Sequence, residues 1–251
     1  MPSKISAFAP LAIGILLPRW GGAQARQDTI PFVGCPADGQ AGPIEAPKGP
    51  PKVVAGTEVP ASRLAYYKGE EAPGLFGPRG WHCRVWYGSS GSTLIITPTL
   101  IDSTLGLPRK LQGEALELSV SSGGTSGRFV VAHYAARLFP RVAAKFIARV
   151  QNEGLAPASE FQSGPYPHDS VKYLGTLVAG FTTPAGVKGL GTGGSLYQSQ
   201  DPVRGVAVLD QSDADEPDLL IMRERLGSDL RDVAGAIFQL NRACMQTTEY
   251  C

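Results

Sequence analysis

A glycine-rich turn, "SSGGTSGRF" at residues 121–129, carries the hydroxyl groups whose setting most resembles that of an enzyme. It connects a strand-like run, "ALELSV", to an Ala-rich run that is typical of a helix. A serine or threonine on a sharp turn from a strand into a helix can act as the nucleophile of a hydrolase. The first hypothesis is therefore a secreted hydrolase with Thr125 or Ser126 as its nucleophile.

The spacing around the two hydroxyls only partly fits that hypothesis. The turn resembles that of the α/β-hydrolases, in which a small residue lies two positions before the nucleophile and two after it. If Ser126 is the nucleophile, Arg128 occupies the second small position. If Thr125 is the nucleophile, both glycines fit, but threonine is rare in this role. This resemblance covers only about twenty residues.

The order of the remaining catalytic residues argues further against a hydrolase. In that family an acid and then a histidine follow the nucleophile along the chain. No aspartate lies between Arg128 and His168, so Glu153 or Glu160 would have to be the acid, and no histidine follows His168.

The same turn fits two other interpretations. Backbone N–H groups at the start of a helix attract anions, so Gly124, Thr125, Ser126 and Arg128 are a candidate site for a small anion. Glycines and serines also occur at helix starts that bind nothing, and then only redirect the chain. We expect a structural turn, with an anion as its candidate ligand.

Two other loops invite a ligand interpretation. "PAGVKGLGTGGS", residues 184–195, lacks the strand and helix context of a dinucleotide motif, and we interpret it as a connection that could border a groove. "DQSDADEPD", residues 210–218, does not have the spacing of a calcium loop, so a solvated hairpin turn is favoured. With three scattered histidines and no CxxC pair, we expect neither a metal nor a cofactor.

The N-terminal segment is typical of a signal peptide. "MPSK" is weakly basic, "ISAFAPLAIGILL" is apolar, and Ala23-Gln24-Ala25 has the small-x-small pattern of a cleavage site. The apolar run of about 13 residues is shorter than the ~20 that a membrane span needs. We therefore expect residues 1–25 to be removed, no later transmembrane segment, and a periplasmic or extracellular location.

Export implies that the cysteines form disulfides. Cys35, Cys83, Cys244 and Cys251 allow three pairings. We favour Cys35–Cys83, which would fasten the N-terminal arm, and Cys244–Cys251, which would fasten the C-terminal tail.

The elements that must position these residues follow from the hydrophobic pattern. Residues 26–60 are rich in proline and glycine and predict an extended, irregular arm, whereas 61–251 predict a single domain. "WHCRVWYG" and "STLIITP" form a hairpin pattern around "GSSG", and "RGVAVLD" and "DLLIMRERL" form another. "ALELSVS" places Leu116, Leu118 and Val120 on one face of a strand. "VKYLGTLVAGFTTP" is interpreted as one long strand.

Helical periodicity begins at Arg128, resumes after Pro140 and ends at Gly154. The last helix starts near Ser228, a candidate N-cap. The fold class is therefore α+β, with a mostly antiparallel sheet built from hairpins and covered by two or three helices.

The segments "VGCPADGQAGPIEAPKG", "GPRGWHC", "GGTSGRF" and "SGPYPHD" together resemble a group of uncharacterised exported bacterial proteins. The resemblance implies export and a shared fold, and it implies no activity. Lys and Arg (23) balance Asp and Glu (22), and no basic stripe is present, so nucleic acid is not an expected partner. We expect a non-catalytic structural or binding protein, with a small anion or an envelope component as candidate partner.

Overall fold

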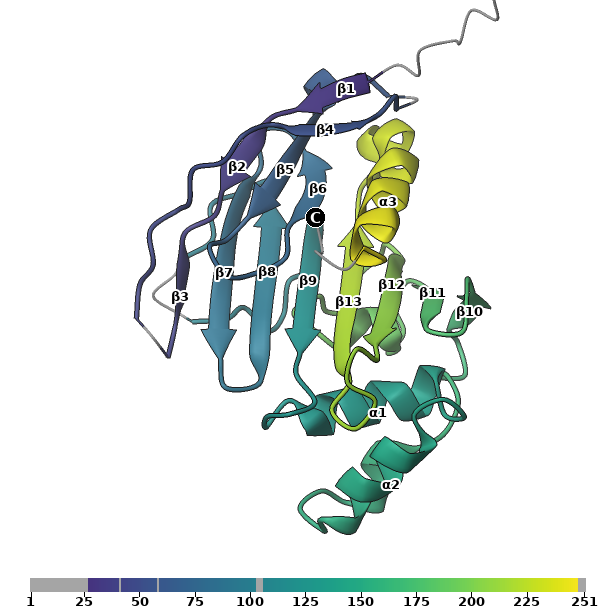
Figure 1. Cartoon of the computed structure of the whole chain (residues 1–251). Helices are drawn as coiled ribbons and strands as arrows, with labels where there is room; N and C mark the ends of the chain where they lie inside the picture. Colours follow the sequence, from purple (N-terminus) through teal and green to yellow (C-terminus); the bar gives the residue numbers. More distant parts are fainter. Residues whose placement is uncertain (1–26, 41, 58, 103–105, 248–251) are drawn as a thin grey trace, which may run out of the picture.

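The computed structural model describes residues 27–40, 42–57, 59–102 and 106–247. Its centre is an eight-stranded sheet with the strand order β10-β11-β12-β13-β9-β8-β7-β3 (Figure 1). Every pair in this sheet is antiparallel except β3 and β7, which are parallel. The predicted α+β class is therefore confirmed. The strands are β3 (Ala37–Gly39), β7 (His82–Gly88), β8 (Gly91–Thr97), β9 (Ala115–Ser121), β10 (Ser170–Tyr173), β11 (Val178–Thr183), β12 (Val203–Asp210) and β13 (Asp218–Arg225).

Both predicted hairpins are confirmed, β7–β8 and β12–β13. The single long strand expected at 171–184 is wrong, because the chain turns back through exposed Gly175 and Thr176 and forms the β10–β11 hairpin. The segment after the arm is also more regular than expected. It forms β5 (Leu64–Lys68) and β6 (Leu75–Pro78), whose aromatic side chains are buried.

One face of the large sheet carries the main core of the molecule. Leu116 and Leu118 of β9 point to this face, as the alternation predicts, and join a core that includes Val206 and Met222. The small sheet of β2 (Phe32–Gly34), β5 and β6 and helix α3 (Arg231–Met245) pack against it. In Figure 1, α3 passes in front of β12 and β13.

The opposite face is only half covered. Helix α1 (Arg128–Leu138) and helix α2 (Ala144–Asn152) bury a second core against β11, β12 and β13. That core uses Phe181, Ala207 and Ile221 from the strands and Val131 and Phe146 from the helices. Gly154 ends α2 as predicted and has a positive φ of 69°.

The N-terminal arm contains four short strands, more order than its composition indicates. They are β1 (Gln27–Ile30), β2 (Phe32–Gly34), β3 and β4 (Lys52–Ala55), with β1 paired to β4. The Cys35–Cys83 disulfide joins the arm to β7, as predicted. Cys244 is also disulfide-bonded, and the Cys251 end of the second predicted bridge lies outside the described residues, as do residues 1–25, for which a signal peptide is predicted.

Helix α3 is fixed to the small sheet by an asparagine. Asn241 is 0% exposed, accepts a hydrogen bond from the backbone N of Phe76 at 2.7 Å, and donates one to the O of Phe76 at 2.8 Å. Ser228 is not the N-cap of this helix, because Ser228–Leu230 forms a separate 3-10 turn and Leu230 precedes the first helical residue. No helix within the described ranges is long and apolar enough to cross a membrane.

Candidate functional site

A cleft of about 760 Å³ lies on the open half of the sheet, above β7, β8 and β9. Helix α1 forms one wall with Val130 and Tyr134, and the segment 193–195 adjoins that wall. Leu107–Arg109, from the connection between β8 and β9, also line the cleft. The cleft is therefore assembled from elements far apart in the sequence.

The floor of the cleft is a row of cross-strand neighbours. Thr93 and Ser119 lie opposite one another on β8 and β9 and form its centre. Trp86 of β7 ends the row on one side, where it forms a wall, and Ile221 of β13 ends it on the other. Gly91 and Ser121 form the next row. Small and hydroxyl-bearing side chains offer little apolar area to a helix, so α1 and α2 pack on the apolar strands instead. The same pattern leaves donors and acceptors facing the cleft.

A buried ion pair supports one end of this floor. Glu117 and Arg223 are register partners on β9 and β13, and Nη1 of Arg223 donates to Oε1 of Glu117 at 2.6 Å. Their side chains are 0% and 1% exposed. Glu117 also accepts from the backbone N of Ser195 at 2.5 Å and from Oγ of Ser119 at 2.8 Å. A buried charge needs this many partners to offset its lost hydration.

Arg223 makes three further contacts. Its Nη2 donates to Oη of Tyr134 at 2.9 Å, its Nε to the O of Leu190 at 3.0 Å, and Nη1 also reaches Ser119. Burial alone would lower the pKa of Arg223, but the adjoining Tyr134 and Glu117 oxygens raise it. Burial raises the pKa of Tyr134. The cluster is therefore a cationic guanidinium, a carboxylate and a neutral phenol, fixed in one arrangement.

The Gly-rich loop borders this cleft, as the sequence suggested. A Cβ at Gly194 would lie 2.0 Å from Oε1 of Glu117, and one at Gly193 would lie 2.1 Å from Oη of Tyr134. No side chain fits at either position. The consecutive glycines therefore let the loop reach the buried cluster and place the Ser195 N–H on the carboxylate.

Trp86 forms part of the cleft wall and is 8% exposed. Its indole Nε1 is buried and has no hydrogen-bond partner within the described residues. An unpaired buried donor costs roughly 1–3 kcal/mol. A ligand oxygen that reached this N–H would remove that cost.

The turn at 121–128 is the candidate nucleophile and anion site of the sequence. Its polar groups bind other groups of the protein. Nε and Nη2 of Arg128 bind the carboxylate of Glu153 at 2.8–3.0 Å, and Nη1 binds the O of Thr125. The backbone N of Gly123 donates to Asp218. A Cβ at Gly124 would lie 2.6 Å from a carboxylate oxygen of Glu216. Three carboxylates surround the candidate anion site, and they would repel an anion.

The two hydroxyls of this turn also lack catalytic partners among the described residues. Oγ1 of Thr125 donates to the O of Ser122 at 3.0 Å, and Oγ of Ser126 lies 3.2 Å from Oγ of Ser89. Neither contact would activate a nucleophile. The anion site and the hydrolase nucleophile stay predictions, and these contacts favour the structural turn.

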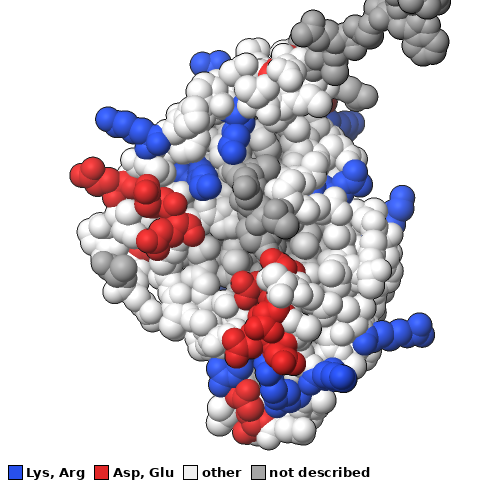
Figure 2. Space-filling model, in the orientation of Figure 1, with Lys and Arg blue, Asp and Glu red and all other residues white. Residues whose placement is uncertain are grey.

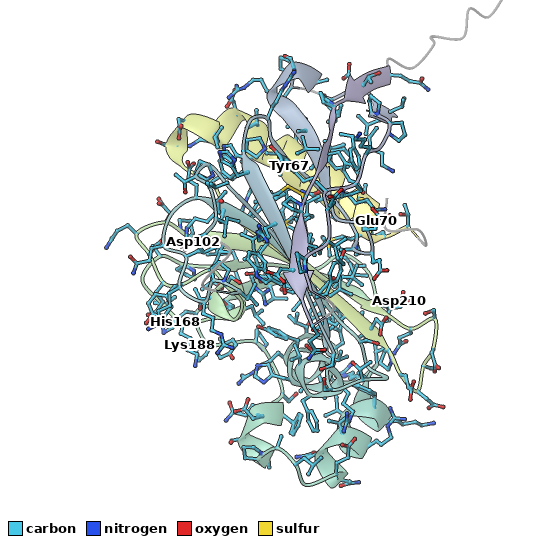
Figure 3. All side chains as sticks on the ribbon, turned by 90° about the vertical axis from the view of Figure 1, so that its left-hand side faces the viewer. Tyr67, Glu70, Asp102, His168, Lys188 and Asp210 are labelled. Atoms are coloured by element: carbon cyan, nitrogen blue, oxygen red, sulfur yellow. A yellow bond between two sulfur atoms is a disulfide. The ribbon has the colours of Figure 1, made fainter. Side chains whose placement is uncertain are left out.

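The histidines lie away from the cleft. The ring of His133 contacts the O of Glu160 at 2.6 Å, and burial lowers its pKa. His168 is exposed and lies at the opposite edge of the molecule from Asp210 of the acidic turn (Figure 3). Within the described ranges, no group of three His, Cys, Asp or Glu residues could hold a metal.

The cleft has one hydroxyl–carboxylate pair, Ser119 and Glu117, and its geometry does not suit nucleophilic catalysis. A general base must be free to accept the proton that it removes. Glu117 already accepts from Arg223, from the backbone of Ser195 and from Ser119. The arrangement suits binding, because it holds donors and acceptors in place.

Sequence reasoning missed most of this site. The alternation in "ALELSVS" did place Glu117 and Ser119 on the face opposite the leucines. The paired arginine lies 106 residues further along the chain, and nothing local to either residue connects them. A charged residue inside each of two apolar strands was the available signal, because such residues are rarely buried unless paired.

On the face drawn in Figure 2, acidic side chains gather in two groups, and basic side chains lie around the outline, in the upper part of the face and beside the lower acidic group. A scan against protein-family models and searches of curated proteins and of solved structures found no match.

Proposed function

We propose that the chain is an exported, non-catalytic binding protein and that the cleft above β7, β8 and β9 is its ligand site. The observation that carries this proposal is the half-covered sheet. Its open half has a polar floor, a tryptophan wall and a cluster that fixes the loop beside it. A concave site with a few fixed polar groups is typical of small-molecule binding.

The chemistry of the lining favours an uncharged ligand with several hydroxyl groups, such as a sugar. The charges of Glu117 and Arg223 neutralise each other, which leaves Arg109 as the one other charged side chain of the lining. Hydroxyls from Thr93 and Ser121 offer both donors and acceptors. An aromatic wall suits the apolar faces of such a molecule.

Export rests on the N-terminal sequence pattern, and the Cys35–Cys83 disulfide is compatible with it. N-terminal sequencing of protein from its native source should find a chain that begins near Arg26. The hydrolase with Thr125 or Ser126 as nucleophile is the alternative, and the contacts of that turn give it less support.

The test of the cleft is a fluorescence titration with a panel of neutral sugars and polyols. In a Trp81→Phe background, Trp86 is the only tryptophan beyond Trp20, so its emission reports on the wall of the cleft. We expect a saturable change with at least one compound. Thr93→Tyr should fill the floor and weaken that binding by about tenfold or more.

The matched control is Thr29→Tyr, the same substitution at an exposed position on β1. It should leave the titration unchanged. Failure of every neutral compound, or equal affinity in the Thr93→Tyr variant, would contradict the proposal.

A further inference from the structure

A second pocket, of about 290 Å³, lies on the other face of the sheet, between the strands β10–β12 and helix α3. It is separate from the cleft because Arg204 shares a face with Glu224 and Leu116, whereas Arg223 points the opposite way. Its polar side chains are Ser170, Lys172, Thr182, Arg204, Gln239 and Arg242.

The charged side chains that line this pocket are all cations, and Glu224, a carboxylate outside the lining, binds one of them. Lys172, Arg204 and Arg242 contribute to the lining, and no carboxylate does. Within the described residues, neither Lys172 nor Arg242 has an ion-pair partner. Nε of Arg242 is buried without a hydrogen-bond partner. Like charges that line one pocket repel each other, and an anion bound between them would relieve that repulsion.

One nitrogen of the Arg204 guanidinium is held by contacts within the protein, and the other two are available to bind a ligand. Its Nη2 binds the carboxylate of Glu224 and, at 3.2 Å, the O of Ala234. Its guanidinium lies 5.3 Å from the centre of the Phe238 ring. Its Nε and Nη1 make no hydrogen bond with the described residues, and its side chain is 42% exposed.

We propose that this pocket binds a small tetrahedral oxyanion, either inorganic phosphate or sulfate, or the phosphate group of a small ester. Three cations from two strands and a helix approach from different sides, which suits an anion with several oxygens. The hydroxyls of Ser170 and Thr182 supply neutral donors beside them. A planar carboxylate would satisfy fewer of these groups at once.

The test is isothermal titration calorimetry of the full chain with inorganic phosphate at pH 7.5. Sulfate, glycerol 3-phosphate and acetate form the comparison arms. A preference for glycerol 3-phosphate over phosphate identifies an ester ligand, and the reverse identifies the free ion. Acetate should bind most weakly.

Two variants and one control locate the site. Arg242→Gln should weaken phosphate binding by about tenfold, and Lys172→Gln by about threefold, because each removes one charge–charge contact. Lys172 is exposed on the edge strand, so its replacement does not threaten the fold. Arg231→Gln, an exposed arginine on the same helix and outside the pocket, should change nothing.

The cleft variant Thr93→Tyr separates this inference from the proposed function, because it should leave phosphate binding intact. The inference is overturned if phosphate produces no saturable heat, if Arg231→Gln weakens binding as much as Lys172→Gln, or if acetate binds as tightly as phosphate.

Discussion

Two buried glutamates on neighbouring strands face opposite sides of the same sheet. Glu117 of β9 is 0% exposed and accepts hydrogen bonds from Arg223, from the backbone N of Ser195 and from Ser119. Glu224 of β13 is 1% exposed and is bound by Arg204, while its Oε2 has no partner within the described residues. The two side chains are about equally buried, but Glu117 has more hydrogen-bond donors around it than Glu224.

The pKa of Glu224 reflects this shortage of donors. Burial raises the pKa of Glu224 to about 7, and the nearby Arg204 only partly opposes this. The side chain of Arg204 is 42% exposed, so water screens its attraction for Glu224. Glu117 instead faces an arginine buried as deeply as itself, with two more donors beside it.

The largest expected effect comes from removing the arginine of the better-supplied pair. Arg223→Met should lower the free energy of unfolding by about 3–5 kcal/mol, because it leaves Glu117 buried without its charge partner. Urea unfolding at pH 7 measures this. The double variant Glu117→Gln with Arg223→Met should recover most of the loss. If Arg223→Met alone is as stable as the wild type, Glu117 does not depend on its arginine partner.

The second prediction concerns pH. Since the pKa of Glu224 is raised in the folded state, the folded protein binds more protons than the unfolded chain between about pH 4.5 and 7. The stability that this group contributes is therefore present at low pH and is lost as the pH rises through about 7. Glu224→Gln should remove this dependence, which amounts to about 2–3 kcal/mol.

The measurement is the difference in unfolding free energy between wild type and variant from pH 5 to pH 8. The free energy of unfolding of the variant should rise relative to that of the wild type as the pH rises. Glu45→Gln, at an exposed glutamate, is the control and should give a constant difference. A constant difference for Glu224→Gln as well would show that the pKa of Glu224 is not raised in the folded state.

The smallest expected effect tests the phenol beside Arg223. Tyr134→Phe removes the acceptor of the 2.9 Å bond from Nη2 and should cost about 1–2 kcal/mol in unfolding free energy. Tyr173→Phe, where the tyrosine is 55% exposed, should cost almost nothing. Equal costs would mean that the hydrogen bond from Arg223 to Tyr134 contributes little to stability.

The sequence predicted those parts of the fold that depend on local periodicity. The hairpins β7–β8 and β12–β13 and the leucine face of β9 follow from alternation and turn residues. The β10–β11 turn was missed because the run on both sides of Gly175 is apolar enough to read as one strand.

The candidate site could not be predicted in the same way. Glu117 lies on the expected polar face, but its burial depends on a loop 78 residues later. Two glycines in that loop make the approach possible, and a glycine pair alone indicates only a turn. The conspicuous turn at 121–128 instead binds carboxylates of its own chain.

The amide of Asn241 has a consequence for how copies of this chain meet. Strand β6 is the last strand of the small sheet, and an open strand edge is a template on which other chains can pair and aggregate. By engaging both the N–H and the O of Phe76, Asn241 takes the place of a neighbouring strand at that residue. Helix α3 therefore occupies the backbone groups of this edge at Phe76, where a strand of another copy would otherwise have to pair.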